Sequence, residues 1–201
     1  FFFTLVFQGL TVSLSSLVSE LGIGDAATTG TLSSISMVFG MIVSAFFGPI
    51  FGVTKRFGGR VLCLFGMAVA LLIMITMRSF VGIAASMCLF SFFGLQVMIS
   101  SMASAANGAP DSVKGKIGAF CQTGVKIAVF VVSYFTAASL AVAPATGLYA
   151  FAPSAAQYSA DLWTGALLCI ICGVVGIVAL AIKKGKGEKD AAEAAKAQVA
   201  Q

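Results

Sequence analysis

Residues 162–182, LWTGALLCIICGVVGIVALAI, form an uninterrupted apolar run between Asp161 and Lys183. A helix of about 20 such residues spans the roughly 30 Å hydrocarbon core of a lipid bilayer. Because the backbone polar groups find no water at that depth, they must bond to one another, and a helix does this within one segment. The stretch therefore predicts a transmembrane helix.

The rest of the chain has the same character. Its residues are 59% hydrophobic and 9% charged, with a mean hydropathy of +1.05, which lies well outside the range of soluble domains. We therefore predict an all-α fold, with a polytopic bundle of six transmembrane helices over residues 1–182 and a charged, frayed cytoplasmic tail over residues 183–201. The six predicted spans are residues 1–19, 29–53, 60–77, 80–106, 117–141 and 162–182.

Basic residues predict the orientation of these spans. Ten of the twelve lie in the second and fourth connections and in the tail, which an even number of spans places on one side. Since Lys and Arg are retained in cytoplasmic loops, we expect a protein of the cell membrane with a cytoplasmic C-terminus. The basic balance thus reflects topology, and nucleic acid is not an expected partner. The ten residues are Lys55, Arg56, Arg60, Lys114, Lys116, Lys183, Lys184, Lys186, Lys189 and Lys196.

The chain contains no histidine, and its five cysteines all fall within predicted spans. The absence of histidine removes His-bound zinc, haem ligation by His and triads with a histidine base. We interpret the Cys169-x-x-Cys172 pair as packing, because it lies within one helical turn inside lipid. The sequence therefore predicts neither a metal site nor a cofactor, and it does not predict an enzyme.

Polar residues form stripes along the first and fourth spans, at steps of three or four that share one helix face. Such stripes either join helices by hydrogen bonds or border water. The amides of Gln8 and Gln96 favour water, because each brings more donors and acceptors than a tight interface readily satisfies. The stripes are Thr4, Gln8, Thr11, Ser15 and Ser19 in the first span, and Gln96, Ser100, Ser104 and Asn107 in the fourth.

The other spans differ in polarity. In the second span, Ser33, Ser36, Gly40 and Ser44 form a milder stripe that we interpret as helix packing. The third and sixth spans have almost no polar residues, so we expect them to face lipid around most of their circumference.

Lys126 is the one basic residue in the interior of a predicted span, since Arg60 is the first residue of the third span. Ten residues separate it from Lys116, which at about 1.5 Å per residue places it about 15 Å deep, near the midplane. An unpaired charge there costs about 2.5 to 3.5 kcal/mol, so a polar cavity is the more favourable environment. Gln122 lies one turn earlier and Ser133 two turns later on the same face, and we expect them to extend this polar stripe.

Residues 48–62, GPIFGVTKRFGGRVL, resemble the loop between the second and third helices of each half of a major facilitator superfamily transporter. That loop reads Gly-x-x-x-Asp-(Arg/Lys)-x-Gly-(Arg/Lys)-(Arg/Lys). Arg56, Gly58 and Arg60 match it, whereas Lys55 replaces the aspartate and Gly59 replaces one basic residue. Such departures are common in the second-half copy of the loop.

The resemblance covers nearly all of residues 1–185 and implies the second six-helix half of a twelve-helix secondary transporter. The chain begins at membrane depth without an initiator methionine, so we expect an N-terminal half as its partner. The resemblance implies alternating access for a small solute at a midplane site, a gating role for Arg56, Gly58 and Arg60, and attraction of an anion by Lys126. The expected cavity residues are Gln8, Thr11, Ser15, Gln96, Ser100, Gln122 and Lys126.

A self-contained six-helix channel or membrane assembly protein is the alternative that the sequence leaves open. An open reading frame with six further spans upstream would favour the transporter, and an initiator codon just upstream would favour the alternative.

Overall fold

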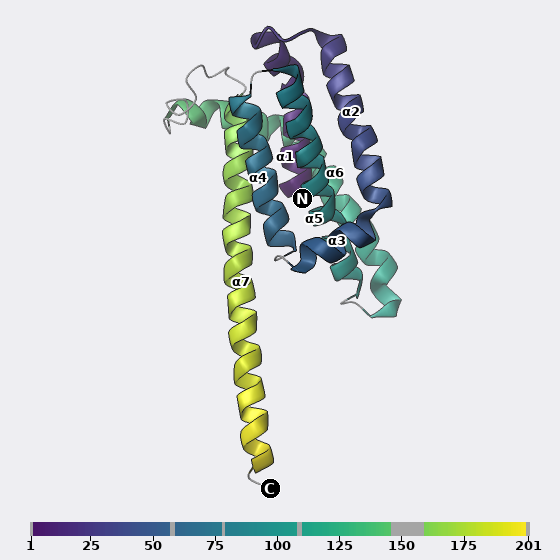
Figure 1. Ribbon diagram of the computed structural model, residues 1–201, viewed down its shortest axis with the longest axis vertical. Helices are drawn as coiled ribbons and strands as arrows, with labels where there is room; N and C mark the ends of the chain where they lie inside the picture. Colours follow the sequence, from purple (N-terminus) through teal and green to yellow (C-terminus); the bar gives the residue numbers. More distant parts are fainter. Residues whose placement is uncertain (1, 57–58, 78, 108–109, 146–158, 200–201) are drawn as a thin grey trace.

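The computed structural model describes residues 2–56, 59–77, 79–107, 110–145 and 159–199 of the chain. Within these ranges the structure consists of helices and contains no strand (Figure 1), which confirms the all-α prediction. The helices are α1 (Phe2–Glu20), α2 (Ala26–Ala45), α3 (Phe47–Arg56), α4 (Arg60–Thr76), α5 (Phe80–Asn107), the short 3₁₀ helix η1 (Asp111–Val113), α6 (Lys114–Ala145) and α7 (Ser159–Val199).

Within the described residues, four helices contain segments that are long and apolar enough to cross a membrane. α1 and α4 contribute apolar segments that are shorter. This set of helices is consistent with a multi-pass membrane protein. The four long segments are Ala26–Ala45, Phe80–Asn107, Lys114–Ala138 and Leu162–Ile182, and the shorter two are Thr4–Ser19 and Arg60–Thr76.

The second predicted span, residues 29–53, is two helices instead of one. α2 ends at Ala45, and α3 begins at Phe47 after the intervening Phe46. Pro49 accounts for the break, because a proline has no N–H and its ring clashes with the carbonyl four residues earlier, so it fits the first turn of a helix better than the interior. Figure 1 shows α3 lying across the end of the bundle, between the ends of α2 and α4.

The start of α2 is fixed by Asp25, which forms a capping box with Thr28. The Asp25 side chain accepts hydrogen bonds from the backbone N–H groups of Ala27 and Thr28, and the Thr28 side chain accepts from the Asp25 N–H. These bonds satisfy N–H groups that have no partner within the helix.

The helices pack in a definite set of pairs. α4 packs against α5 and α7, α2 packs against α5, and α1 packs against α6, α7 and α2, while α5 also contacts α6. Exchanging α1 with α5, α2 with α6 and α4 with α7 leaves the pair of α4 and α7 unchanged and converts each of the other pairs named above into another of them. The contact between α6 and α7 is the exception, since α2 and α4 show no packing of that extent among the described residues.

α4 is buried to a degree that the sequence did not predict. The expectation that it faces lipid around most of its circumference is wrong, because α4 contributes much of the largest hydrophobic core. Gly66 lets α5 approach closely: a Cβ atom added there would come within 2.6 Å of the Phe93 ring. α7 conforms better to expectation, since one face of it is exposed. The buried residues of α4 are Cys63, Met67, Ala68, Ala70, Leu71 and Met74.

α7 continues well beyond its apolar segment. The chain remains helical past Ile182 as far as Val199, and Figure 1 shows this part projecting beyond the other helices. The prediction of a frayed tail is therefore wrong for the backbone of these residues. Alanine, lysine and glutamate dominate this segment, and all three are strong helix formers.

Candidate functional site

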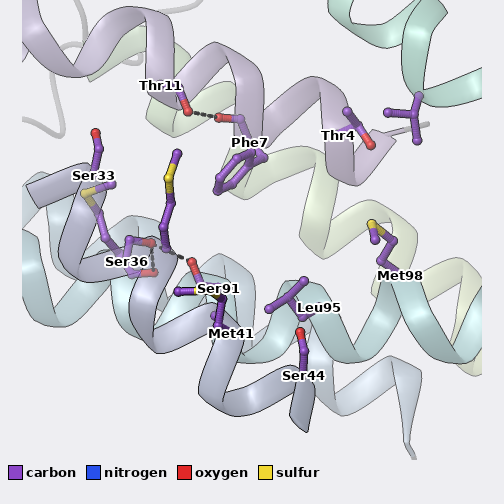
Figure 2. Close-up of a pocket in the computed structure, with 14 residues that line it drawn as sticks. Thr4, Phe7, Thr11, Ser33, Ser36, Met41, Ser44, Ser91, Leu95 and Met98 are labelled. Carbon is purple, nitrogen blue, oxygen red and sulfur yellow. Dashed lines mark hydrogen bonds between the residues drawn. The ribbon is translucent and has the colours of Figure 1, made fainter. Parts of the chain in front are cut away.

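A pocket of about 740 Å³ lies between four helices (Figure 2). α1, α2 and α5 form its walls, and α6 contributes Val125. None of the lining residues that the structure describes comes from α4 or α7. The lining residues are Thr4, Phe7, Thr11, Ser33, Ser36, Met37, Gly40, Met41, Ser44, Met87, Ser91, Leu95, Met98 and Val125.

The chemistry of the pocket wall is apolar with scattered hydroxyl groups. Four methionines provide flexible, polarizable surface, and the six Ser and Thr residues provide the polar groups. No Asp, Glu, Lys or Arg is among the described residues that line the pocket. A wall of this kind offers dispersion contacts and a few hydrogen bonds, and it offers no counter-charge.

Two serines join α2 to α5 at the pocket wall. The Oγ atoms of Ser36 and Ser91 lie 2.7 Å apart, and the Ser36 hydroxyl also lies 3.4 Å from the Met87 carbonyl oxygen. Both serines are buried. Figure 2 shows the pair between the two helices. For Ser36, the packing interpretation of the second-span stripe therefore agrees with the structure.

Other hydroxyl groups on the wall are differently engaged. Thr11 donates a hydrogen bond to the Phe7 carbonyl oxygen, one turn back on α1, at 2.9 Å. The Thr4, Ser33 and Ser44 hydroxyls form no hydrogen bond with any residue that the structure describes. These three groups are therefore free to bond with a molecule in the pocket.

The structure distributes the predicted cavity residues over several environments. Thr11 lines the pocket. Gln96 and Ser100 are buried in the packed interior of α5 instead of on the pocket wall. On α1, Gln8 is half-buried and Ser15 is exposed, and neither lines the pocket.

Lys126 and Gln122 lie one turn apart on α6, and both are exposed. Neither residue lines the pocket, but Lys126 directly follows Val125, which does line it. Ser133, two turns further along α6, is exposed as well. All three residues of the stripe predicted for this helix are therefore exposed, and none of them is on the pocket wall.

The predicted gate loop is described only in part. Arg60 begins α4, and its guanidinium donates a hydrogen bond to the Ser104 hydroxyl near the end of α5. Arg56 is the last residue of α3, and Gly58 lies outside the described residues. The Arg60 contact ties the start of α4 to the polar stripe of the fourth predicted span.

The sequence did not identify the largest part of the wall. α2 supplies six lining residues, among them Ser33, Met37, Met41 and Ser44. The signal was present in the stripe of the second span, but the spacing of small polar residues is the same whether they face a helix or a cavity. Within the described residues, no group of three His, Cys, Asp or Glu side chains could hold a metal ion.

Comparison of the chain with protein-family models, with curated proteins and with solved structures finds no match.

Proposed function

We propose that this chain is one six-helix half of a secondary transporter of the major facilitator type, which moves a small solute across the cell membrane by alternating access. The observation that carries the proposal is the pocket, because it is lined by the first, second, fourth and fifth membrane helices in chain order. In the family that the sequence resembles, the first and fourth helices of each half border the central cavity, while the third and sixth lie outside it.

The packing pairs give independent support. The exchange of α1, α2 and α4 with α5, α6 and α7 preserves nearly the whole set of pairs. Such a relation between the first three and the last three spans is expected of two inverted three-helix repeats, which are nested in each half of these transporters. In this scheme α1 and α4 are the two short membrane helices, and they complete the six spans.

The surface beside the pocket supports a second bundle as the partner. Lys126 is exposed on a helix that is apolar enough to span a membrane, and a charge facing lipid near the midplane is costly. Phe120 and Phe130, on the same helix, are 80% and 75% exposed. A facing six-helix bundle would cover these rings and place Lys126 at an aqueous interface.

In this proposal Lys126 attracts an anionic group of the solute, and Gln122 lies beside it. The basic loops and the tail face the cytoplasm, as the positive-inside rule requires. Arg60, bonded to Ser104, then closes the cytoplasmic end of the bundle between α4 and α5.

Cysteine accessibility tests the proposal. Ser33→Cys and Ser44→Cys introduce thiols on the pocket wall, and Val175→Cys introduces one on the exposed face of α7, where we expect lipid. In intact membranes, both pocket thiols should react with a membrane-impermeant thiol reagent, beyond the labelling of the parent protein, and Val175→Cys should not. If neither pocket thiol reacts from either side of the membrane, the pocket is not water-accessible and the transporter proposal fails.

A further inference from the structure

The composition of the pocket wall limits what the pocket can hold. Its polar groups are hydroxyls, and its remaining side chains are methionine, phenylalanine, leucine and valine. A charged group placed there would lose its hydration without gaining a counter-ion among the described lining residues, which is strongly unfavourable. The pocket therefore selects against charge.

Methionine makes the wall adaptable. Met37 and Met41 lie one turn apart on α2 and are 62% and 65% exposed, while Met87 is buried on the facing α5. Unbranched thioether side chains repack around apolar groups of different shape, and they contact aromatic rings favourably. The Phe7 ring, which stacks on Phe90 at a centroid distance of 6.2 Å, adds an aromatic surface. Figure 2 shows Phe7 extending from α1 toward the residues of α2 and α5.

We propose that the pocket holds an uncharged, apolar body of the solute, such as an aromatic ring system, oriented by one or two hydrogen bonds to Ser33, Ser44 or Thr4. The proposal deepens the transport function proposed above. It rests on that function only in identifying the bound molecule as the transported solute. It places any anionic group of the solute outside the pocket, at Lys126. The solute class is then a lipophilic molecule with at most a peripheral negative charge, and small hydrophilic anions are excluded.

A matched pair of fluorescent probes tests this assignment. N-phenyl-1-naphthylamine is uncharged, and 1-anilinonaphthalene-8-sulfonate has the same ring system with a sulfonate. Binding of each to the full chain in lipid nanodiscs is measured by fluorescence, with the signal of empty nanodiscs subtracted. We expect saturable binding of both probes, and no competition by acetate or phosphate.

Variants of α2 locate the binding site. Ser44→Phe fills the pocket and should weaken binding of both probes by at least about tenfold, whereas Ser34→Phe, on the same helix but outside the pocket, should change it by less than about twofold. Ser33→Phe, at the other end of the α2 wall, should act like Ser44→Phe. It keeps the test valid if Ser44→Phe does not fold. Unchanged binding in both pocket variants, with monodisperse protein, would overturn the proposal.

Lys126→Ala separates this inference from the proposed function. We expect the variant to weaken the sulfonate probe alone. If it weakens neither probe while Ser44→Phe weakens both, the pocket assignment stands and the anion role of Lys126 fails. If the probes bind as expected but the pocket thiols described above are inaccessible in membranes, the transport function fails and the binding site remains.

Discussion

The hydroxyl oxygens of Ser36 on α2 and Ser91 on α5 lie 2.7 Å apart, and both side chains are buried. This contact joins two helices that both line the pocket. The pair is therefore one of the contacts that hold α2 and α5 together at the pocket wall.

A double-mutant cycle should measure this contact. We expect Ser36→Ala and Ser91→Ala to show a coupling energy of about 0.6 kcal/mol, and no more than about 1.7 kcal/mol, as found for hydrogen bonds between membrane helices. Reversible unfolding in detergent provides the measurement. Ser34→Ala is the control, since Ser34 bonds only to the Gly30 carbonyl of its own helix. Purely additive effects of the two substitutions would contradict the contact.

Gly66→Ala tests the close approach of α4 and α5. The new methyl group would lie 2.6 Å from the Phe93 ring, and overpacking of this kind costs about 1 to 3 kcal/mol of unfolding free energy. Gly30→Ala on α2 is the matched control, because a Cβ atom there meets nothing within 4 Å. The control should be neutral or slightly stabilising, given the higher helix propensity of alanine. Equal stabilities of the two variants would argue against the packing of α4 on α5.

Asp25 should make the start of α2 sensitive to acid. The backbone hydrogen bond from Thr28, aided by the Thr28 side chain, lowers the pKa of the Asp25 carboxyl from its ordinary value of 3.8. Since the folded pKa is depressed, the stabilisation is fully present above the ordinary value and is lost as the pH falls through the folded one. Hydrogen exchange of the first turn of α2, corrected for intrinsic rates, should therefore accelerate below about pH 3.8.

Substitution of the cap provides the control for that experiment. Asp25→Ala should show rapid exchange in the first turn of α2 at every pH, whereas Asp25→Asn should retain most of the protection without the acid dependence, because asparagine also caps helices. An identical pH dependence in Asp25→Asn would assign the effect to another group.

Lys126→Ala should abolish or strongly reduce transport of an anionic solute while expression stays normal. The reason is the loss of the only basic residue in the interior of a predicted span, which in the proposed function attracts the negative group. Lys116→Ala removes an exposed charge near the start of the same helix and should leave transport unchanged. Uptake into proteoliposomes that contain the whole transporter measures the effect. A fully active Lys126→Ala protein would refute the role of this lysine.

Helical periodicity and charge breaks were sufficient to predict the all-α fold and the approximate positions of the four helices that are long and apolar enough to cross a membrane. They were not sufficient to predict what each apolar helix contacts. α4 and α7 are similarly poor in polar residues, yet α5 packs closely on α4 at Gly66, while α7 exposes Val175. Lipid and protein interior are both apolar, so composition cannot separate them.

The polar residues of the candidate site show the same ambiguity, because their sequence pattern does not reveal whether they contact a helix or line a cavity. Ser33 and Ser36 belong to one stripe, but Ser36 bonds to Ser91, whereas Ser33 lines the pocket. Gln96 was expected beside water and is fully buried. Two residues that are three positions apart point in similar but not identical directions from a helix. The tilt of the neighbouring helix then decides which polar group contacts a partner and which one lines a cavity.

The break between α2 and α3 at Phe46 has a mechanical consequence. α2 and α3 are separate rigid rods, and α3, not α2, packs against α4. Because no continuous helix joins α2 to α3, the backbone can bend at Phe46, and a change in the tilt of α2 is not passed on as the rigid rotation of one long helix.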